Sequence, residues 1–201
     1  MEPQRRQALL GAMLDELVQR GYWEMSVARA REVAGVSIEE FEAEFGGKDD
    51  CLYAAYDLLT EEVLAKASAG CDGAESWPDR VRAGLVTVLD EFAARPEVAK
   101  AVMRAFPGIR PSAYQRYVSL LLRFVPFMRE GRDYSGVDGE LPQEVELLAV
   151  GAAEAIIFTE VEAGRTQALP QMMPEILFSV LVPFLGPERA ADEMRLAAAI
   201  R

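Results

Sequence analysis

Few side chains in this sequence could carry out catalysis or hold a metal ion. The 201 residues include no histidine and only two cysteines, Cys51 and Cys71, so neither a disulfide framework nor a zinc site of the usual kind is expected. The sequence has no nucleotide-binding glycine pattern and no visible pairing of a nucleophile with a base. The segment 133–140 hints at a Ca²⁺ loop, but the ligand spacing fails at Val137. We expect no metal, no cofactor and no enzymatic activity.

The charge of the chain is the opposite of what a polyanion-binding protein usually shows. The 21 basic and 33 acidic residues give a net charge of −12, and residues 1–50 contain eleven acids against six bases. Neutralising each phosphate of a nucleic acid normally needs a lysine or an arginine. The basic residues at hand for this in the N-terminal segment are Arg5, Arg6, Arg29, Arg31 and Lys48.

No segment has the pattern of a signal peptide or a membrane span. The N-terminal residues are amphipathic and contain acids, without a continuous apolar run or a small-residue cleavage site. The most apolar stretch, 147–159, is 13 residues long, whereas a membrane-spanning helix needs roughly 20. We expect a cytoplasmic protein that has no membrane partner.

Apolar residues recur with a period of 3.6 along nearly the whole chain, which predicts an all-α fold of about nine helices. The first four helices are expected at about 4–20, 26–33, 37–45 and 48–69. Gly21 and Gly35 should end the first two, because glycine adopts the left-handed conformation at little cost. Ser37 and Glu40 have the spacing of a capping box, which opens the third helix.

The remaining helices are expected at about 76–95, 97–106, 112–130, 142–164 and 174–185, followed by a mobile alanine-rich tail. Pro126 should kink the helix at 112–130, because proline cannot donate a hydrogen bond to the carbonyl of Leu122. Residues 131–140 form the most loop-like stretch.

Three short helices followed by a long one carry a specific set of motifs. They are RGYWEMSV at 20–27, AGVS at 34–37, Phe41, FGGK at 45–48 and LYAAY at 52–56. Together they resemble the N-terminal helix-turn-helix domain of TetR-type transcriptional regulators, over about residues 5–58. The resemblance implies a helix-turn-helix DNA-binding-type domain at 1–50 and a helical ligand-binding and dimerisation domain at 51–201.

In that family the third helix enters the major groove, and the start of the fourth helix holds phosphate. Here the third helix departs from the family pattern, because Glu42 stands where a phosphate-contacting tyrosine is usual and Glu44 replaces a histidine or tyrosine. Arg31 stands where a small alanine normally packs. Lys48 is expected either to contact phosphate or to be a solvated residue. The resemblance implies that operator DNA is contacted by Ser26, Arg29, Ser37, Ile38, Glu42, Glu44 and Lys48.

The helix-turn-helix unit also needs a small core of its own. This core is expected to consist of Val27, Val33, Val36, Phe41 and Phe45, with Leu14 and Leu17 beneath it.

TetR-like proteins place a small-molecule pocket among their middle helices. Aromatic and methionine residues there form ordinary core or line a cavity for an apolar or amphipathic effector, and the Pro126 kink favours the second interpretation. Arg104, Arg116 and Arg123 could reach an anionic ligand or lie on a solvated face. The predicted ligand-binding residues are Phe92, Met103, Phe106, Tyr114, Tyr117, Leu121, Phe124, Phe127, Met128 and Phe158.

The helix at 142–164 is apolar on nearly all sides, so a second partner should cover the face that its own core leaves free. With the last helix it would form a two-fold interface of four helices. Glu154 is expected at the rim of this interface. The predicted homodimer interface consists of Leu148, Gly151, Ala152, Ala155, Leu177, Val180, Leu181 and Phe184.

Two functional hypotheses follow. The first is a ligand-responsive TetR-like repressor that binds operator DNA as a homodimer. The second is a TetR-like dimer that has lost operator binding and acts as a small-molecule-binding or protein-interaction module, and it is motivated by the acidic third helix.

Overall fold

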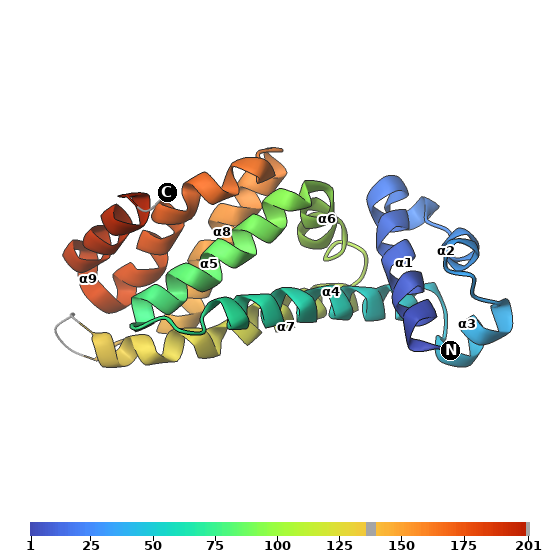
Figure 1. The fold of residues 1–201 in the computed structure, drawn as a ribbon, viewed down its shortest axis with the longest axis horizontal. Coiled ribbons are helices and arrows are strands. Elements are labelled where there is room, and N and C mark those ends of the chain that lie inside the picture. The colour runs from blue at the N-terminus through green and yellow to red at the C-terminus, as the bar shows by residue number, and fades with distance from the viewer. Residues whose placement is uncertain (136–139, 200–201) are drawn as a thin grey trace.

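The fold is all-α, as the sequence predicts. The computed structural model describes residues 1–135 and 140–199, so Val137, which breaks the Ca²⁺-loop spacing, lies outside the described residues. Within those two ranges the chain forms nine α-helices and no β-strand. Figure 1 shows a small N-terminal helical head at one end and a larger helical body at the other.

The head is formed by α1 (Pro3–Glu24), α2 (Val27–Ala34) and α3 (Ile38–Glu44), and α4 (Lys48–Gly70) leads from it into the body. Gly21 and Gly35 have φ values of 73° and 64°, which confirms their predicted roles as breaks in the helices. The capping box at the start of α3 is also confirmed, since Ser37 and Glu40 exchange side-chain and backbone hydrogen bonds.

The predicted core of the head forms with one exception. Leu17, Val36, Phe41 and Phe45 are buried, and Val27 and Leu14 pack partly buried against them. The prediction for Val33 was wrong, because its side chain is 80% exposed. The buried face of α2 is formed by two alanines, Ala30 and Ala34, and Val33 lies beyond the edge of that face.

The core of the head does not stop at residue 50. Leu52 and Tyr56 of α4 are part of it, and so is Phe106, which lies beyond the first helices of the body. The rings of Tyr56 and Phe106 stack with centroids 3.9 Å apart. The expected domain boundary therefore falls in the first turn of a helix that belongs to both packing units.

Within the described residues, the body consists of five further α-helices and three short segments of π- or 3₁₀-helix. In chain order they are α5 (Trp77–Ala94), α6 (Pro96–Lys100), η1 (Ala101–Ala105), α7 (Pro111–Met128), η2 (Arg129–Tyr134), α8 (Val145–Glu162), η3 (Thr166–Met172) and α9 (Met173–Ala199). Pro126 lies inside α7, which gives way to the 3₁₀-helix η2 two residues later.

The C-terminal segment differs from its prediction as a mobile tail. The chain turns at Gly186, where φ is 75°, and remains helical to Ala199. Ala190 and Ala197 are buried against the body, because small side chains allow the last turns to pack closely. By length and composition alone the stretch Thr166–Ala199 could cross a membrane, but half of the apolar window is buried inside the molecule, as in the core helix of a globular domain.

Candidate functional site

Three features of the structure could serve a function, and the first is the outer face of the head. The hydroxyl groups of Ser26 and Ser37 cap α2 and α3 by accepting hydrogen bonds from the backbone N–H groups of Arg29 and Glu40, at 3.3 and 3.1 Å. These caps fix the N-terminal ends of both helices. On α3 the side chains of Ile38 and Glu42 remain exposed.

Four of the six basic side chains in residues 1–50 pair with acids of the same unit. Arg5 pairs with Glu40 at 2.8 Å and Arg6 with Glu44 at 2.6 Å, so two acids of α3 are neutralised by α1. Arg20 and Arg29 both pair with Glu16, at 3.4 and 2.9 Å.

The other two basic side chains of this segment bind backbone carbonyls. Arg31 donates to the carbonyl of Ser37 at 3.2 Å. Lys48 donates to the carbonyl of Tyr22, and its ammonium group lies 4.3 Å from the centre of the Tyr22 ring. Lys48 is therefore half-buried and engaged, rather than a solvated residue. Every basic residue of the head has an intramolecular partner.

Glu16 is the centre of the largest of these networks. Its carboxylate accepts hydrogen bonds from the Arg29 guanidinium at 2.9 Å and from the backbone N–H of Ser26 at 2.8 Å. These bonds, chiefly the one from Arg29, lower the pKa of Glu16 from 4.5 to about 2 although burial opposes the shift. The carboxylate thus ties α1 to the first turn of α2.

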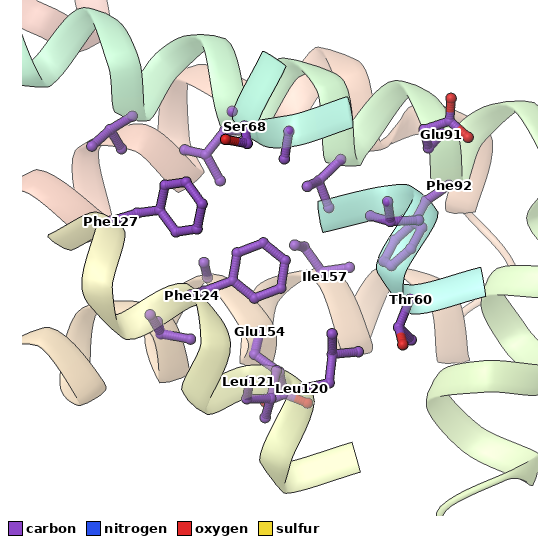
Figure 2. A pocket seen from close by; sticks show the side chains of 18 of the residues that line it. Thr60, Ser68, Glu91, Phe92, Leu120, Leu121, Phe124, Phe127, Glu154 and Ile157 are labelled. Carbon is purple, nitrogen blue, oxygen red and sulfur yellow. The ribbon is translucent and has the colours of Figure 1, made fainter. Parts of the chain in front are cut away.

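The second feature is a cavity of about 420 Å³ in the body. Its walls come from α4, α5, α7 and α8, with smaller contributions from α6, η1 and α9. The lining is mostly aliphatic and aromatic, and its volume lies within the range of small-molecule pockets. Figure 2 shows the rings of Phe124 and Phe127 pointing into the space.

The structure brings together most of the predicted ligand-binding residues. Those that line the cavity are Phe92, Met103, Tyr117, Leu121, Phe124, Phe127 and Met128.

Three other residues of the predicted set lie elsewhere, and these predictions were wrong. Phe106 is fully buried, but in the core of the head. Tyr114 is 56% exposed near the start of α7, and Phe158 is exposed on α8. Periodicity identifies apolar residues on a helix, but it does not say which of two cores or surfaces a given face meets.

The basic residues predicted to reach an anionic ligand do not line the cavity. Arg104 pairs with Glu162 at 3.1 Å. Arg116 and Arg123 form ion pairs with Asp57 and Glu61, which join α7 to α4.

Sequence reasoning missed most polar residues of the cavity wall. Arg80 and Arg95 line it, each already paired with an acid. Glu154, expected at the rim of a dimer interface, also lines the cavity, where its carboxylate accepts a hydrogen bond from the Tyr117 hydroxyl. Burial and this carboxylate raise the pKa of Tyr117, so the phenol remains a donor.

A third surface bears on assembly. On α8, Leu148 and Ala155 are exposed, and Gly151 and Ala152 between them are half-buried, so one face of this apolar helix is free in the protomer. The predicted contribution of α9 was wrong, because its four residues are already packed in the core of the protomer. These are Leu177, Val180, Leu181 and Phe184, each at most 2% exposed.

No protein-family model matches the sequence. A curated relative, the HTH-type transcriptional regulator BetI 1 of Chromohalobacter salexigens, is 33% identical over 107 residues. The match covers 53% of this chain and 51% of that relative, so it spans about half the length of each.

Solved structures match over nearly the whole chain. The fatty acid degradation regulator FadR from Bacillus halodurans matches with a TM-score of 0.76 and 14% identity, over 90% of this chain and 96% of its own. A protein described as a TetR-family transcriptional regulator from Rhodococcus sp. matches with a TM-score of 0.70 and 20% identity, over 91% and 100%. A TetR-family regulator from Marinobacter aquaeolei matches with a TM-score of 0.61 and 16% identity, over 85% and 93%. The structural likeness confirms the resemblance seen in the sequence: the chain has the fold of the TetR-family transcriptional regulators.

Proposed function

We propose that this protein is a ligand-responsive transcriptional regulator of the TetR type. It acts in the cytoplasm as a repressor, binds operator DNA as a homodimer and releases it when a small molecule enters the cavity. The proteins that it resembles are described as regulators, not as enzymes, which supports this class of function.

The observation that carries the proposal is the shared packing of α4. Leu52 and Tyr56, in its first half, belong to the core of the head. Val63 and Ala67, in its second half, line the cavity. Leu59 lies between them and belongs to both the core of the head and the cavity wall. A ligand that displaces this side chain acts on the packing of the head directly.

Such a contact can couple two sites because close-packed cores transmit small displacements. A ligand shifts the equilibrium between two arrangements of the head by its differential affinity for them. In a dimer the two recognition helices must meet half-sites separated by roughly 34–36 Å, about one turn of DNA. Moving α4 changes this separation and weakens binding.

The free face of α8 is the proposed dimer interface. Leu148 is 60% exposed, and the small residues Gly151, Ala152 and Ala155 would allow a second helix to approach closely. Because the residues on the inner side of α9 are occupied, we place the contact on α8 and on the half-buried outer residues of α9, such as Phe178 and Val182.

DNA binding by the head requires phosphates to replace the acids that now pair with its arginines. The side chains of Arg5 and Arg6 are 40% and 41% exposed, and exposed ion pairs are worth about 0.2–1 kcal/mol, whereas Arg29 is held by the buried carboxylate of Glu16. Exchange of a carboxylate for a phosphate at Arg5 and Arg6 therefore costs little free energy. The exposed acid Glu42 opposes binding at the groove, so we expect weak affinity that falls steeply with salt.

The test is selection of duplex fragments from a genomic library at about 50 mM salt, followed by gel shift with the enriched sequence. Ile38→Ala removes an exposed apolar side chain from the reading face of α3 and should weaken binding at least tenfold. Leu196→Ala removes an exposed leucine from α9, at the far end of the molecule (Figure 1), and should leave binding unchanged.

The second candidate function is a TetR-like dimer without operator binding, which acts as a small-molecule-binding or protein-interaction module. The observation in its favour is that all six basic side chains of residues 1–50 are engaged within the head. If no duplex is retained at about 50 mM salt while a ligand still binds the cavity, this second function replaces the first.

A further inference from the structure

The charges along the cavity wall are unevenly compensated. Glu91 pairs with Lys66 at 2.6 Å and with Arg95 at 2.8 Å, and Glu130 pairs with Arg80. Arg80 is therefore matched one to one, whereas Lys66 and Arg95 share the single charge of Glu91, so this group keeps one positive charge. The side chains of Lys66 and Arg95 are 53% and 41% exposed, so solvent screens this charge and it attracts an anion inside the cavity only weakly.

Glu154 differs from these acids. It projects from the middle of α8 into the wall, and Figure 2 shows it beside Leu121 and below the Phe124 ring. In the part of the chain that the structure describes, no basic group lies within ion-pair distance of its carboxylate. Its hydrogen-bond partner is the neutral hydroxyl of Tyr117. A carboxylate has about four acceptor sites, so one bond from a phenol leaves both charge and acceptor capacity free.

The surroundings of Glu154 are suited to a positive charge. The rings of Tyr117, Phe124 and Phe127 line the same cavity, and aromatic faces attract cations. The rest of the wall is aliphatic, including Leu121 and Ile157, and this part would take a hydrocarbon chain. An anionic head group would instead lie beside the carboxylate of Glu154. Two negative charges close together in a mostly apolar cavity would cost free energy.

We propose that the cavity takes an amphiphilic cation, an alkyl or aryl amine or quaternary ammonium compound. Its charged end lies against Glu154, and its apolar part fills the space between α4, α5 and α7. This inference rests on the proposed function in one respect, since it takes the cavity to be the effector site.

Isothermal titration calorimetry with three probes of equal chain length tests the charge preference. The probes are dodecyltrimethylammonium and dodecanoate, each below its critical micelle concentration, and dodecanol below its solubility limit. The cation should bind wild-type protein at least tenfold more tightly than dodecanoate. Glu154→Gln keeps an acceptor for Tyr117 but removes the charge, and it should weaken binding of the cation at least tenfold without weakening dodecanol.

Two control variants separate the cavity from the acidic surface. Glu162→Gln removes an exposed acid from the same helix, outside the cavity, and should leave all three affinities unchanged. Leu121→Trp fills the cavity and should abolish binding of every probe, whereas adsorption of the cation to the surface would survive it. The thermal midpoint of each variant verifies that it is folded.

The outcomes distinguish this inference from the proposed function. If dodecanoate binds as tightly as the cation, or if Glu154→Gln leaves the cation unaffected, the charge preference is overturned and the cavity remains a ligand site. If none of the three probes binds, or if the cation binds equally to Leu121→Trp, the cavity is not the effector site, and the ligand-responsive part of the proposed function fails as well.

Discussion

Replacing Glu16 with glutamine removes the charge that joins α1 to the beginning of α2. In the folded protein Glu16 is buried, and its carboxylate accepts hydrogen bonds from Arg29 and from the backbone of Ser26. Glutamine keeps the size and one acceptor but cannot pair with the guanidinium. The substitution should therefore destabilise the head without emptying its core.

The size of the effect follows from the pKa of Glu16, which is lowered from 4.5 to about 2. At 1.36 kcal/mol per pKa unit, the shift corresponds to at most about 3.4 kcal/mol. Arg29 is 45% exposed, and because solvent screens such a pair we expect a loss of about 1–2 kcal/mol at pH 7.

The stabilisation that Glu16 contributes depends on pH. A folded-state pKa below the unfolded one stabilises the protein fully above about pH 4.5, and this contribution disappears as the pH falls through about 2. At about pH 3 the difference in unfolding free energy between wild type and Glu16→Gln should be less than about half of its value at pH 7.

Urea unfolding at both pH values measures this difference. Glu42→Gln is the matched control, because Glu42 is exposed on the same head and has no ion pair within the described structure; it should change stability by less than about 0.5 kcal/mol. An equal loss for the two variants, or the same loss for Glu16→Gln at both pH values, would show that the charge of Glu16 does not stabilise the contact between α1 and α2.

Other substitutions test the packing of the body and the proposed dimer. A Cβ atom on Gly131 would lie 2.6 Å from the Trp77 ring, so Gly131→Ala should destabilise the protein by about 1–3 kcal/mol in thermal or urea unfolding. Gly11→Ala, which meets nothing within 4 Å on a helix, should instead be neutral or stabilising by up to about 1 kcal/mol. Leu148→Arg places a charge on the free face of α8 and should convert a dimer to a monomer in light scattering after size-exclusion chromatography, with no loss of helicity; a dimer that persists would place the interface elsewhere.

Much of the fold could be predicted from the sequence because its signals are local. Gly35 and the capping box of Ser37 with Glu40 act through their own backbone, so the ends of α2 and α3 follow from residue type. The same is true of the break at Gly21. For this reason, helices with a clear apolar stripe can be predicted from the sequence at nearly the boundaries that the structure shows.

The errors concern contacts between elements that are distant in sequence. Nothing near Val33 indicates that two alanines would face the core in its place. The spacing of Leu177 and Phe184 fits a helix face in a dimer interface as well as a helix face in a core. The structure shows that both residues lie in the core. The alanine-rich C-terminus gives no apolar stripe, yet it packs because the body offers it a close-fitting surface.

The candidate site was only partly predictable for the same reason. The aromatic residues of α7 that line the cavity could be predicted because they cluster in one helix. Phe106 instead lies in the core of the head, where its ring stacks on Tyr56. The sequence predicts Glu154 at a dimer rim because it is the lone charge of an apolar stretch. Its position in the cavity depends on how α8 is rotated against α7, and no local signal specifies that rotation.

If α4 couples the cavity to the head, filling the cavity should change the affinity for DNA. This affinity can be measured for the wild-type protein and an enriched operator fragment by fluorescence anisotropy, with and without saturating dodecyltrimethylammonium. We expect the ligand to weaken DNA binding at least tenfold, and in Glu154→Gln the same concentration should have much less effect. If the DNA affinity is unchanged while calorimetry shows that the cavity is filled, α4 does not couple the cavity to the head.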